Sequence, residues 1–148
     1  MIIQGPYPVF GQPAKGVTYT DRPGAYALMY NEAGEMALVE TSTGLFLPGG
    51  GLEPGETHEQ ALNRELMEEI GHREIQLRAY AEAHQFHWSE FYQQHFKKIG
   101  KFFLVETKPP PQETSQAGHG LLWKDPKIAA KTLSQEFQRW AVNESLKI

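Results

Sequence analysis

Short apolar runs separated by turn residues characterise much of the chain. Two such runs, residues 25–30 and 36–40, flank a turn sequence at residues 31–34 that ends in glycine, so the pattern predicts a β-hairpin. Later runs either alternate imperfectly between apolar and polar side chains or are continuously apolar, which also indicates strands. These further strands are predicted at residues 75–88 (one long or broken strand), 100–106 and 121–123.

The pattern changes at residues 57–70, which contain no proline or glycine and are rich in Ala, Leu, Met, Glu and Gln. Gly71 follows, and glycine is favoured just beyond the end of a helix, so we predict a helix that ends at Ile70. At about 100° per residue, Leu62, Leu66 and Ile70 form an apolar stripe. An adjacent stripe holds three carboxylates, those of Glu65, Glu68 and Glu69.

The C-terminal third predicts a loop and two more helices. Residues 108–120 are rich in Pro, Gly and Ser, and helical patterns follow at residues 126–131 and 134–146. Strands that flank one central helix, with helices at the end, predict an α/β (α+β) protein in which a central mixed β-sheet is sandwiched between helices. A length of 148 residues suits a single domain over residues 1–148.

Composition narrows the range of functions. No apolar run is long enough to span a membrane, and the N-terminal residues lack the features of a signal peptide, so we expect a cytoplasmic protein without a membrane partner. The absence of cysteine excludes disulfides and thiolate metal sites. A formal net charge of −4 argues against polymeric nucleic acid as a partner. The basic cluster Lys97, Lys98 and Lys101 fits a solvated strand end or a phosphate contact.

The carboxylate stripe carries the candidate chemistry. Like charges three and four positions apart on a helix repel, and a close cluster of carboxylates tends to retain protons. A bound cation removes this penalty. Carboxylate oxygens suit Mg²⁺ or Mn²⁺, and Mg²⁺ commonly takes further ligands from substrate phosphates. Glu65, Glu68 and Glu69 therefore predict a divalent-metal site for a phosphate-bearing substrate.

A glycine-rich loop precedes the predicted helix. Residues 48–51 read Pro-Gly-Gly-Gly, and backbone without Cβ atoms can pass close to a ligand, so carbonyl or amide groups there can complete the site. Glu56 lies eight residues before Arg64, a spacing that allows an ion pair between loop and helix. We assign Glu56 and Arg64 orienting roles, in which Arg64 holds Glu65 in its rotamer.

Glutamate-rich helices are common, and a Glu-Glu pair alone usually lies on a solvated face. The joint spacing of seven residues makes that interpretation a poor one for this chain. They follow the pattern GX₅EX₇REUXEEXGU, with U an aliphatic residue and His72 as the departure at the last position: Gly50, Glu56, Arg64, Glu65, Glu68, Glu69 and Gly71. This stretch resembles the signature box of the Nudix hydrolases.

The resemblance implies a Nudix-type α/β/α sandwich and a hydrolase that cleaves a pyrophosphate bond in a nucleoside diphosphate joined to another group. It implies that Glu65, Glu68 and Glu69 bind divalent ions, with Mg²⁺ the expected cofactor and Mn²⁺ the alternative, and that the Gly49 carbonyl adds a ligand. Residues 45–50 and 121–123 are also similar to the family, although Leu45 stands where members often carry an aromatic residue.

Three of the six histidines and five aromatic residues are concentrated in residues 84–96. His84 and His87 are an odd number of positions apart and would face opposite sides of a strand, which argues against a zinc site. Aromatic rings bind nucleobases by stacking, so Phe86 and Trp88 are candidates for substrate binding. The alternative is that these aromatic side chains pack at the edge of the core or at a homodimer interface.

Hydrolysis also needs a base that activates water, within hydrogen-bond reach or through the metal. Glu68 or Glu69 can serve as this base. Candidates for the base on later loops are Glu90, Glu113 and His119, although a loop histidine is commonly only solvent-exposed. Glu113 and His119 are also candidates for substrate contact.

Features linked to several substrate subclasses of the family are missing. Residues 72–108 contain no proline, so the proline associated with ADP-ribose hydrolysis is absent, and so is the array linked to NADH hydrolysis. The short single-domain chain favours a small-molecule substrate, a nucleoside triphosphate cleaved to monophosphate and pyrophosphate. The alternatives are a nucleotide sugar or other nucleoside diphosphate conjugate, and a regulatory module that binds a nucleotide without turnover.

Overall fold

The structure, a computed structural model, describes residues 2–3, 5–71, 75–107, 115–116 and 119–148. None of the helices in these ranges is long and apolar enough to cross a membrane. The elements are, in chain order, β1 (Val9–Phe10), β2 (Thr20–Met29), β3 (Met36–Thr41), β4 (Gly44–Phe46), β5 (Gly49–Gly51), α1 (His58–Ile70), β6 (Ile75–Ser89), β7 (Gln94–Thr107), β8 (Ser115–Gln116), β9 (His119–Lys124), α2 (Pro126–Thr132) and α3 (Glu136–Ser145).

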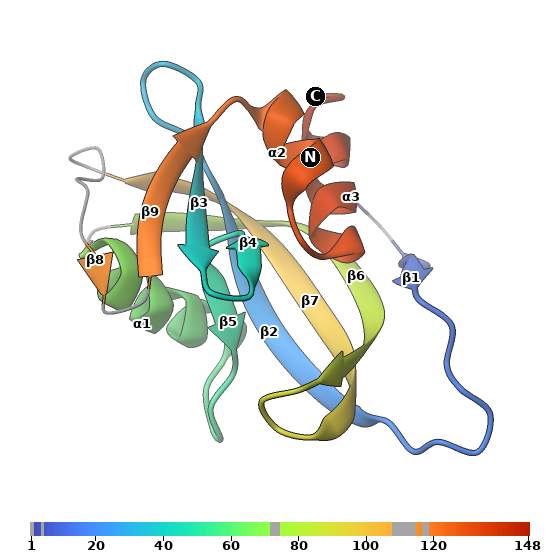
Figure 1. Cartoon of the computed structure of the whole chain (residues 1–148). Helices are drawn as coiled ribbons and strands as arrows, with labels where there is room; N and C mark the ends of the chain where they lie inside the picture. Colours follow the sequence, from blue (N-terminus) through green and yellow to red (C-terminus); the bar gives the residue numbers. More distant parts are fainter. Residues whose placement is uncertain (1, 4, 72–74, 108–114, 117–118) are drawn as a thin grey trace.

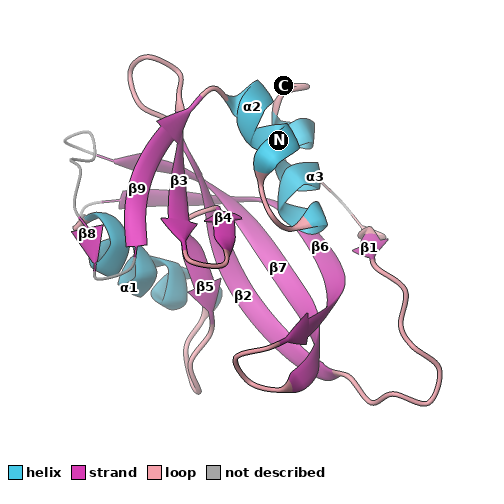
Figure 2. Ribbon diagram, in the orientation of Figure 1, coloured by secondary structure: helices cyan, strands magenta, loops and turns pink. Residues whose placement is uncertain are grey.

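The strands form two sheets with helices on both sides (Figures 1 and 2). The five-stranded sheet, in the order β1-β6-β7-β2-β5, is mixed, because β2 runs parallel to β7 and β1 parallel to β6, whereas β6 with β7 and β2 with β5 are antiparallel. The four-stranded sheet, β4-β3-β9-β8, is antiparallel. The predicted mixed sheet between helices is therefore confirmed, with α1 on one side and α2 and α3 on the other.

The predicted hairpin at residues 25–40 is wrong. Only Tyr30 and Met36 bridge β2 and β3, which then separate into different sheets. The turn itself forms, since Asn31 Oδ1 accepts hydrogen bonds from the backbone N–H groups of Ala33 (3.0 Å) and Glu35 (2.9 Å). The turn residues thus reverse the chain as predicted, but β2 and β3 pair with other strands because tertiary packing determines strand pairing.

The other strand and helix predictions are confirmed, but the predicted glycine-rich loop at residues 48–51 is wrong, because Gly49–Gly51 form strand β5 against β2. The predicted strands correspond to β6, β7 and β9, and the predicted C-terminal helices to α2 and α3. The second of these strands, β7, begins at Gln94 rather than at Gly100, because its polar first half pairs with β6 in a long hairpin. Most of the predicted loop at residues 108–120 lies outside the described residues, and its described part is strand instead, because Ser115–Gln116 form β8 and pair with the start of β9.

Helix α1 ends at Ile70 as predicted and begins at His58, one residue later than predicted. Thr57 Oγ1 accepts a hydrogen bond from Gln60 N–H (3.1 Å), and Gln60 Oε1 accepts one from Thr57 N–H (2.9 Å), which is a capping box. Gly71 ends the helix with a φ of 72°, a left-handed conformation that suits glycine. Leu62 and Leu66 are fully buried in the cluster that joins α1 to the five-stranded sheet.

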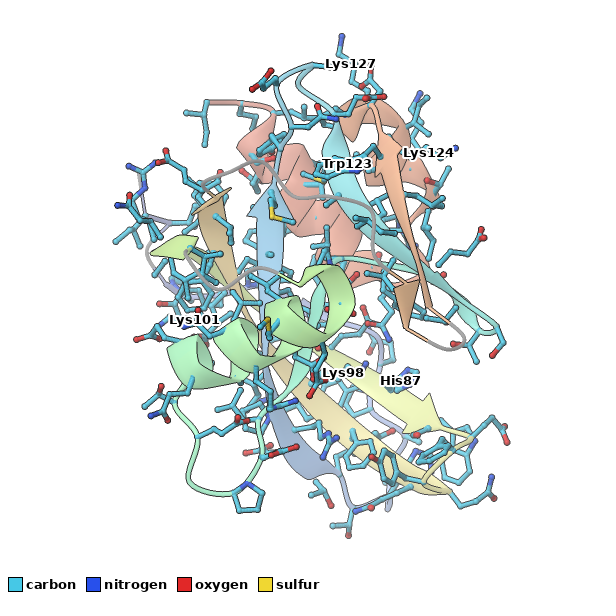
Figure 3. The ribbon with its side chains drawn as sticks, turned by 90° about the vertical axis from the view of Figure 1, so that its left-hand side faces the viewer. His87, Lys98, Lys101, Trp123, Lys124 and Lys127 are labelled. Atoms are coloured by element: carbon cyan, nitrogen blue, oxygen red, sulfur yellow. The ribbon has the colours of Figure 1, made fainter. Side chains whose placement is uncertain are left out.

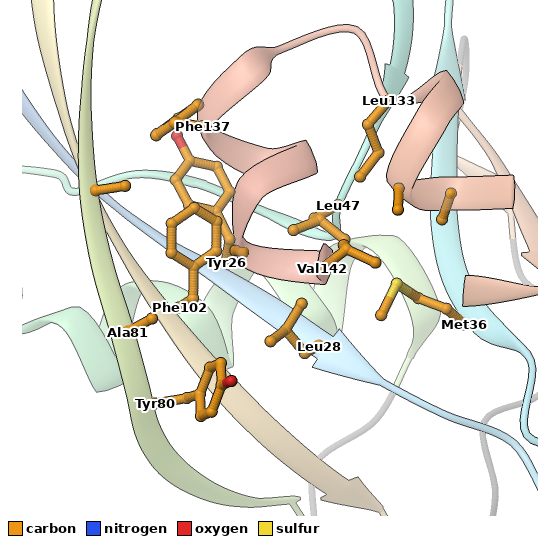
Figure 4. Packing of buried hydrophobic residues seen from close by; sticks show 14 of the residues in the cluster. Tyr26, Leu28, Met36, Leu47, Tyr80, Ala81, Phe102, Leu133, Phe137 and Val142 are labelled. Carbon is orange, nitrogen blue, oxygen red and sulfur yellow. The ribbon is translucent and has the colours of Figure 1, made fainter. Parts of the chain in front are cut away.

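A second buried cluster holds α3 on the opposite face of this sheet (Figure 4). The ring of Phe137 packs edge-to-face against the rings of Tyr26 and Phe102, with centroids 5.6 Å apart in both pairs. Phe137 and Phe102 are fully buried. This packing fixes the position of α3, and with it the polar residues at its N-terminal end.

Candidate active site

The three glutamates of the predicted stripe lie on α1 beside β5, with different degrees of exposure. The side chain of Glu68 is 45% exposed, that of Glu65 is 19% exposed, and Glu69 is buried. Glu65 and Glu69 are one helical turn apart and face β5. The stripe therefore consists of two carboxylates held against the sheet and one that reaches solvent.

The predicted contact between Glu56 and Arg64 is formed, and it is bidentate. Arg64 Nε donates to Glu56 Oε2 (2.8 Å) and Arg64 Nη2 to Glu56 Oε1 (2.9 Å). Arg64 Nη1 also donates to Glu65 Oε1 (2.9 Å), and Nη2 donates to the Gly51 carbonyl (3.2 Å). The hydrogen bonds from Arg64 are the main reason why the pKa of Glu56 falls to about 2. One guanidinium thus connects the loop, the helix and β5.

Glycines let β5 approach the helix closely. Gly49 N–H donates to Glu69 Oε1 (2.9 Å). A Cβ atom on Gly50 would lie 2.8 Å from Glu65 Oε1, so a side chain there would displace the carboxylate. A Cβ atom on Gly51 would lie 3.1 Å from the guanidinium of Arg22, on the other face of the strand.

Burial shifts the two inner carboxyls toward their protonated forms. It raises the pKa of Glu69 to about 8, against the hydrogen bond from Gly49 and with smaller contributions from the charges of Glu65 and Glu68. Burial also raises the pKa of Glu65, although Arg64 opposes the shift. The sequence predicted that the cluster retains protons because of like-charge repulsion. The direction is confirmed, but burial is the larger cause.

The chemistry of these donors fits a hard divalent cation. Carboxylate oxygens are the ligands that Mg²⁺ and Mn²⁺ prefer, and a cation would offset the buried negative charge. Within the described part of the chain, no three His, Cys, Asp or Glu side chains already converge on one point. A metal between Glu65, Glu68 and Glu69 would therefore complete its shell with water or substrate phosphate, as Mg²⁺ commonly does. Gly49, whose carbonyl is the other implied ligand, lies beside Glu69.

A cavity of about 230 Å³ lies across β5 from the glutamates, on the α3 side of the five-stranded sheet. β5 forms one wall, and the end of β4, strands β2, β6 and β7 and the start of α3 form the others. From the aromatic segment of the sequence, the residues that line it are His87, Ser89, Tyr92 and Phe96.

The two aromatic residues selected from the sequence, Phe86 and Trp88, do not line this cavity. They alternate with His87 and Ser89 along β6 and so project from its other face. The ring of Phe86 packs edge-to-face against Tyr19 (centroids 4.8 Å apart), and Trp88 Nε1 donates to Glu90 Oε1 (3.0 Å). The sequence located the right segment but not the face that borders the cavity.

His84 and His87 lie on opposite faces of β6, as predicted. His84 Nε2 contacts Glu82 Oε2 at 2.8 Å, whereas His87 lines the cavity. Burial, together with the nearby charge of Lys98, lowers the pKa of His87.

Several polar residues of the cavity were not selected from the sequence as site residues. Arg22 and Gln135 carried no motif, and Lys98 was noted only within its basic cluster. Gln138 Oε1 accepts a hydrogen bond from Leu47 N–H (2.9 Å). Gln135 is buried, and its Oε1 has no hydrogen-bond partner among the described residues. Arg22 could have been found from the period of two along β2, which places it on the same face as Tyr26, another residue that lines the cavity.

The candidates for a base on later loops are placed differently from one another. Glu90 lies in the turn between β6 and β7, where its carboxylate also accepts a hydrogen bond from Gln93 Nε2 (3.2 Å). His119 begins β9 and pairs through its backbone with Gln116 of β8, and both of these strands contact α1. Glu113 lies outside the described residues.

Comparison with known proteins gives a family match. The sequence model described as the NUDIX domain matches residues 20–139. A search of curated proteins gives no significant match.

Solved structures with a similar fold include three proteins of differently named function. The dihydroneopterin triphosphate pyrophosphohydrolase of E. coli is 16% identical (TM-score 0.66; 86% of this chain and 97% of that chain covered). An Ap4A hydrolase of C. elegans is 17% identical (TM-score 0.65; 86% and 96% covered). A MutT protein of Methanosarcina mazei Go1 is 22% identical (TM-score 0.62; 90% and 100% covered). At these identities the likeness shows the fold.

Proposed function

Because the chain belongs to the Nudix hydrolase family, we propose that its pyrophosphohydrolase reaction takes place at the α1 glutamates beside β5. The family membership makes the protein a hydrolase of nucleoside diphosphate derivatives. One observation supports this location for the reaction. The guanidinium of Arg64 joins Glu56, Glu65 and β5 in a single set of contacts around the acids.

We assign a divalent ion, Mg²⁺ or Mn²⁺, to Glu65, Glu68 and Glu69, with the Gly49 carbonyl as a further ligand. When bound, such an ion lowers the pKa of water and offsets charge on phosphate oxygens. The protein prepares the site through hydrogen bonds: Arg64 orients Glu65, and Gly49 N–H orients Glu69. We assign Glu68, whose side chain reaches solvent, as the base that takes a proton from the attacking water. Glu69 is the other candidate for this base.

For the substrate, we propose a nucleoside triphosphate cleaved to a monophosphate and pyrophosphate. The compact cavity of about 230 Å³ across β5 from the acids supports this choice over a larger conjugate. A nucleotide sugar is the second candidate. The names of the similar structures differ in substrate, so the shared fold favours neither.

A substrate panel tests the reaction and its specificity together. Nucleoside triphosphates, nucleotide sugars and dinucleotides would each be incubated with Mg²⁺, with Mn²⁺ and with EDTA, and the release of phosphate, pyrophosphate and sugar phosphate measured. We expect pyrophosphate from a triphosphate, and no product in EDTA. Sugar phosphate as the main product would select the nucleotide sugar instead.

Two isosteric variants test the assignment of the acids. Glu68→Gln and Glu69→Gln should lower kcat by roughly 10²-fold or more, because each loses a charged ligand or the base. Glu59→Gln, an exposed change in the first turn of the same helix, is the matched control and should keep wild-type turnover. Near-wild-type turnover of both site variants would contradict the assignment. Tight nucleotide binding by calorimetry without hydrolysis would instead indicate a regulatory module.

A further inference from the structure

The cavity across β5 carries positive charge that the chemistry at the glutamates does not use. Arg22, His87 and Lys98 line it, and among the described residues no Asp or Glu does. We propose that this cavity binds a second anionic group of the substrate, a phosphate or carboxylate additional to the diphosphate that is cleaved. The proposal rests on the function proposed above for the glutamates on the other side of β5.

Three neighbouring strands bring these side chains together. Arg22 of β2 is the direct partner of Lys98 in β7, and Lys98 is the direct partner of Gln85 in β6, two residues before His87. Figure 3 shows Lys98 and His87 close to each other, with Lys101 farther along β7. Like charges directly opposite each other on adjacent strands destabilise a sheet. A bound anion would turn this repulsion into attraction.

Among the described residues, no carboxylate offsets the charges of Arg22 and Lys98. In the described ranges, neither Arg22 nor Lys98 forms an ion pair. Arg22 lies instead over the rings of Tyr92 and Phe96, at 5.3 and 5.6 Å from their centroids. Burial, and then the charge of Arg22, lowers the pKa of Lys98 to about 8, which is the shift expected for an ammonium group without a counter-charge.

The amide of Gln138 and the size of the cavity agree with a compact anion. Gln138 Oε1 is occupied by Leu47 N–H, so its Nε2 offers donors to a ligand. The volume of about 230 Å³ is below the ~300–1,000 Å³ of sites that enclose a whole drug-sized ligand. The cavity therefore suits one charged group and its immediate carrier.

A single substrate can reach both sites. β5 is the edge strand of its sheet, and only β2 pairs with it. Gly50 faces Glu65 and Gly51 faces Arg22, and consecutive Cα atoms are about 3.8 Å apart. The metal carboxylates and the cationic cavity are thus separated by the thickness of one strand that has no side chains.

Matched ligand pairs test the proposal with the full-length protein. UDP-glucuronate and UDP-glucose differ by one carboxylate on the distal group, and UTP and UDP differ by one phosphate in the chain. Dissociation constants would be measured by calorimetry in EDTA, where turnover is not needed, and kcat/KM with Mg²⁺. The proteins are the wild type, Lys98→Met, and Lys97→Met as the control, since Lys97 lies on the opposite face of β7 over the Phe86 ring.

We expect the wild type to bind the more anionic member of one pair about tenfold more tightly or better, a preference that Lys98→Met reduces to about twofold and Lys97→Met retains. The pair that responds identifies the source of the anion. The absence of a preference in both pairs would overturn the proposal, and so would an equal weakening of all four ligands by Lys98→Met, which would place Lys98 on the cleaved diphosphate. A Lys98-dependent preference in EDTA without hydrolysis in Mg²⁺ would refute the proposed function alone.

Discussion

At the scale of single residues, the site depends on charges held away from water. Glu69 is buried and bonded to the backbone of β5, whereas Glu68, one residue before it, reaches solvent. Burial therefore raises the pKa of Glu69 to about 8 and favours its protonated form. The hydrogen bonds from Arg64 have the opposite effect on Glu56: they lower its pKa and keep it ionised.

The raised pKa of Glu69 predicts a pH-dependent contribution to stability. Between the ordinary pKa of glutamate and about 8, the folded metal-free protein holds a proton at Glu69 that the unfolded chain has released, so this contribution is lost as the pH rises through that window. Glu69→Gln cannot ionise. Its Tm in EDTA, measured by calorimetry, should therefore rise relative to the wild type between about pH 5 and pH 8. A constant difference across this range would contradict the prediction, and Glu59→Gln should show such a constant difference.

At the scale of elements, the close approach of β5 to α1 makes the site. Gly50 leaves space that the Glu65 carboxylate occupies. In Gly50→Ala, the new Cβ atom would lie 2.8 Å from Glu65 Oε1 and force the carboxylate to move. Since the moving group is the end of a flexible side chain, we expect little loss of Tm but roughly a 10–100-fold loss of kcat or metal affinity.

The control for this substitution is Gly120→Ala, because a Cβ atom on Gly120 would meet no atom of the described residues within 4 Å. Steady-state kinetics and a metal titration of both variants check the prediction. Equal activities in the two variants would mean that the position of Glu65 is not limiting.

The two elements of the site were not equally predictable. α1 was predicted to within one residue, since its stop at Gly71 and its apolar stripe are local signals that agree. β5 has no side-chain pattern, and its role depends on contacts with residues distant in sequence, such as Glu69. Along β6, the alternation of side chains places Phe86 and His87 on opposite faces, but it does not say which face borders a cavity. That choice is made by α3, which packs on one face only.

At the scale of the whole molecule, the active-site region depends on a core that joins both faces of the five-stranded sheet. Phe137 anchors α3, and Gln135 and Gln138 flank it and line the cavity. The Phe137 backbone N–H also donates to Gln85 Oε1 (2.9 Å), which ties the helix to β6. The geometry of the cavity is therefore a property of the packed domain rather than of one segment.

Truncation of this anchor should affect stability strongly. Phe137→Ala removes a fully buried ring that contacts Tyr26 and Phe102, and should lower the free energy of unfolding by about 3–5 kcal/mol in a urea titration. Ile128→Ala, at an exposed position on α2, should stay within about 0.5 kcal/mol of the wild type. Similar losses in the two variants would show that α3 is not anchored by this ring.

β5 consists of glycines alone, so it has no side chain that could fix its register against β2. Glycine-rich strands are prone to slip by one residue, and such a slip would exchange the two faces of this strand. Two polar contacts from α1 oppose it, because Glu69 accepts the Gly49 N–H and Arg64 donates to the Gly51 carbonyl. Glu69 and Arg64, which we assign to the active site, therefore also hold β5 in its register against β2. A substitution of either one acts on strand alignment as well as on the reaction.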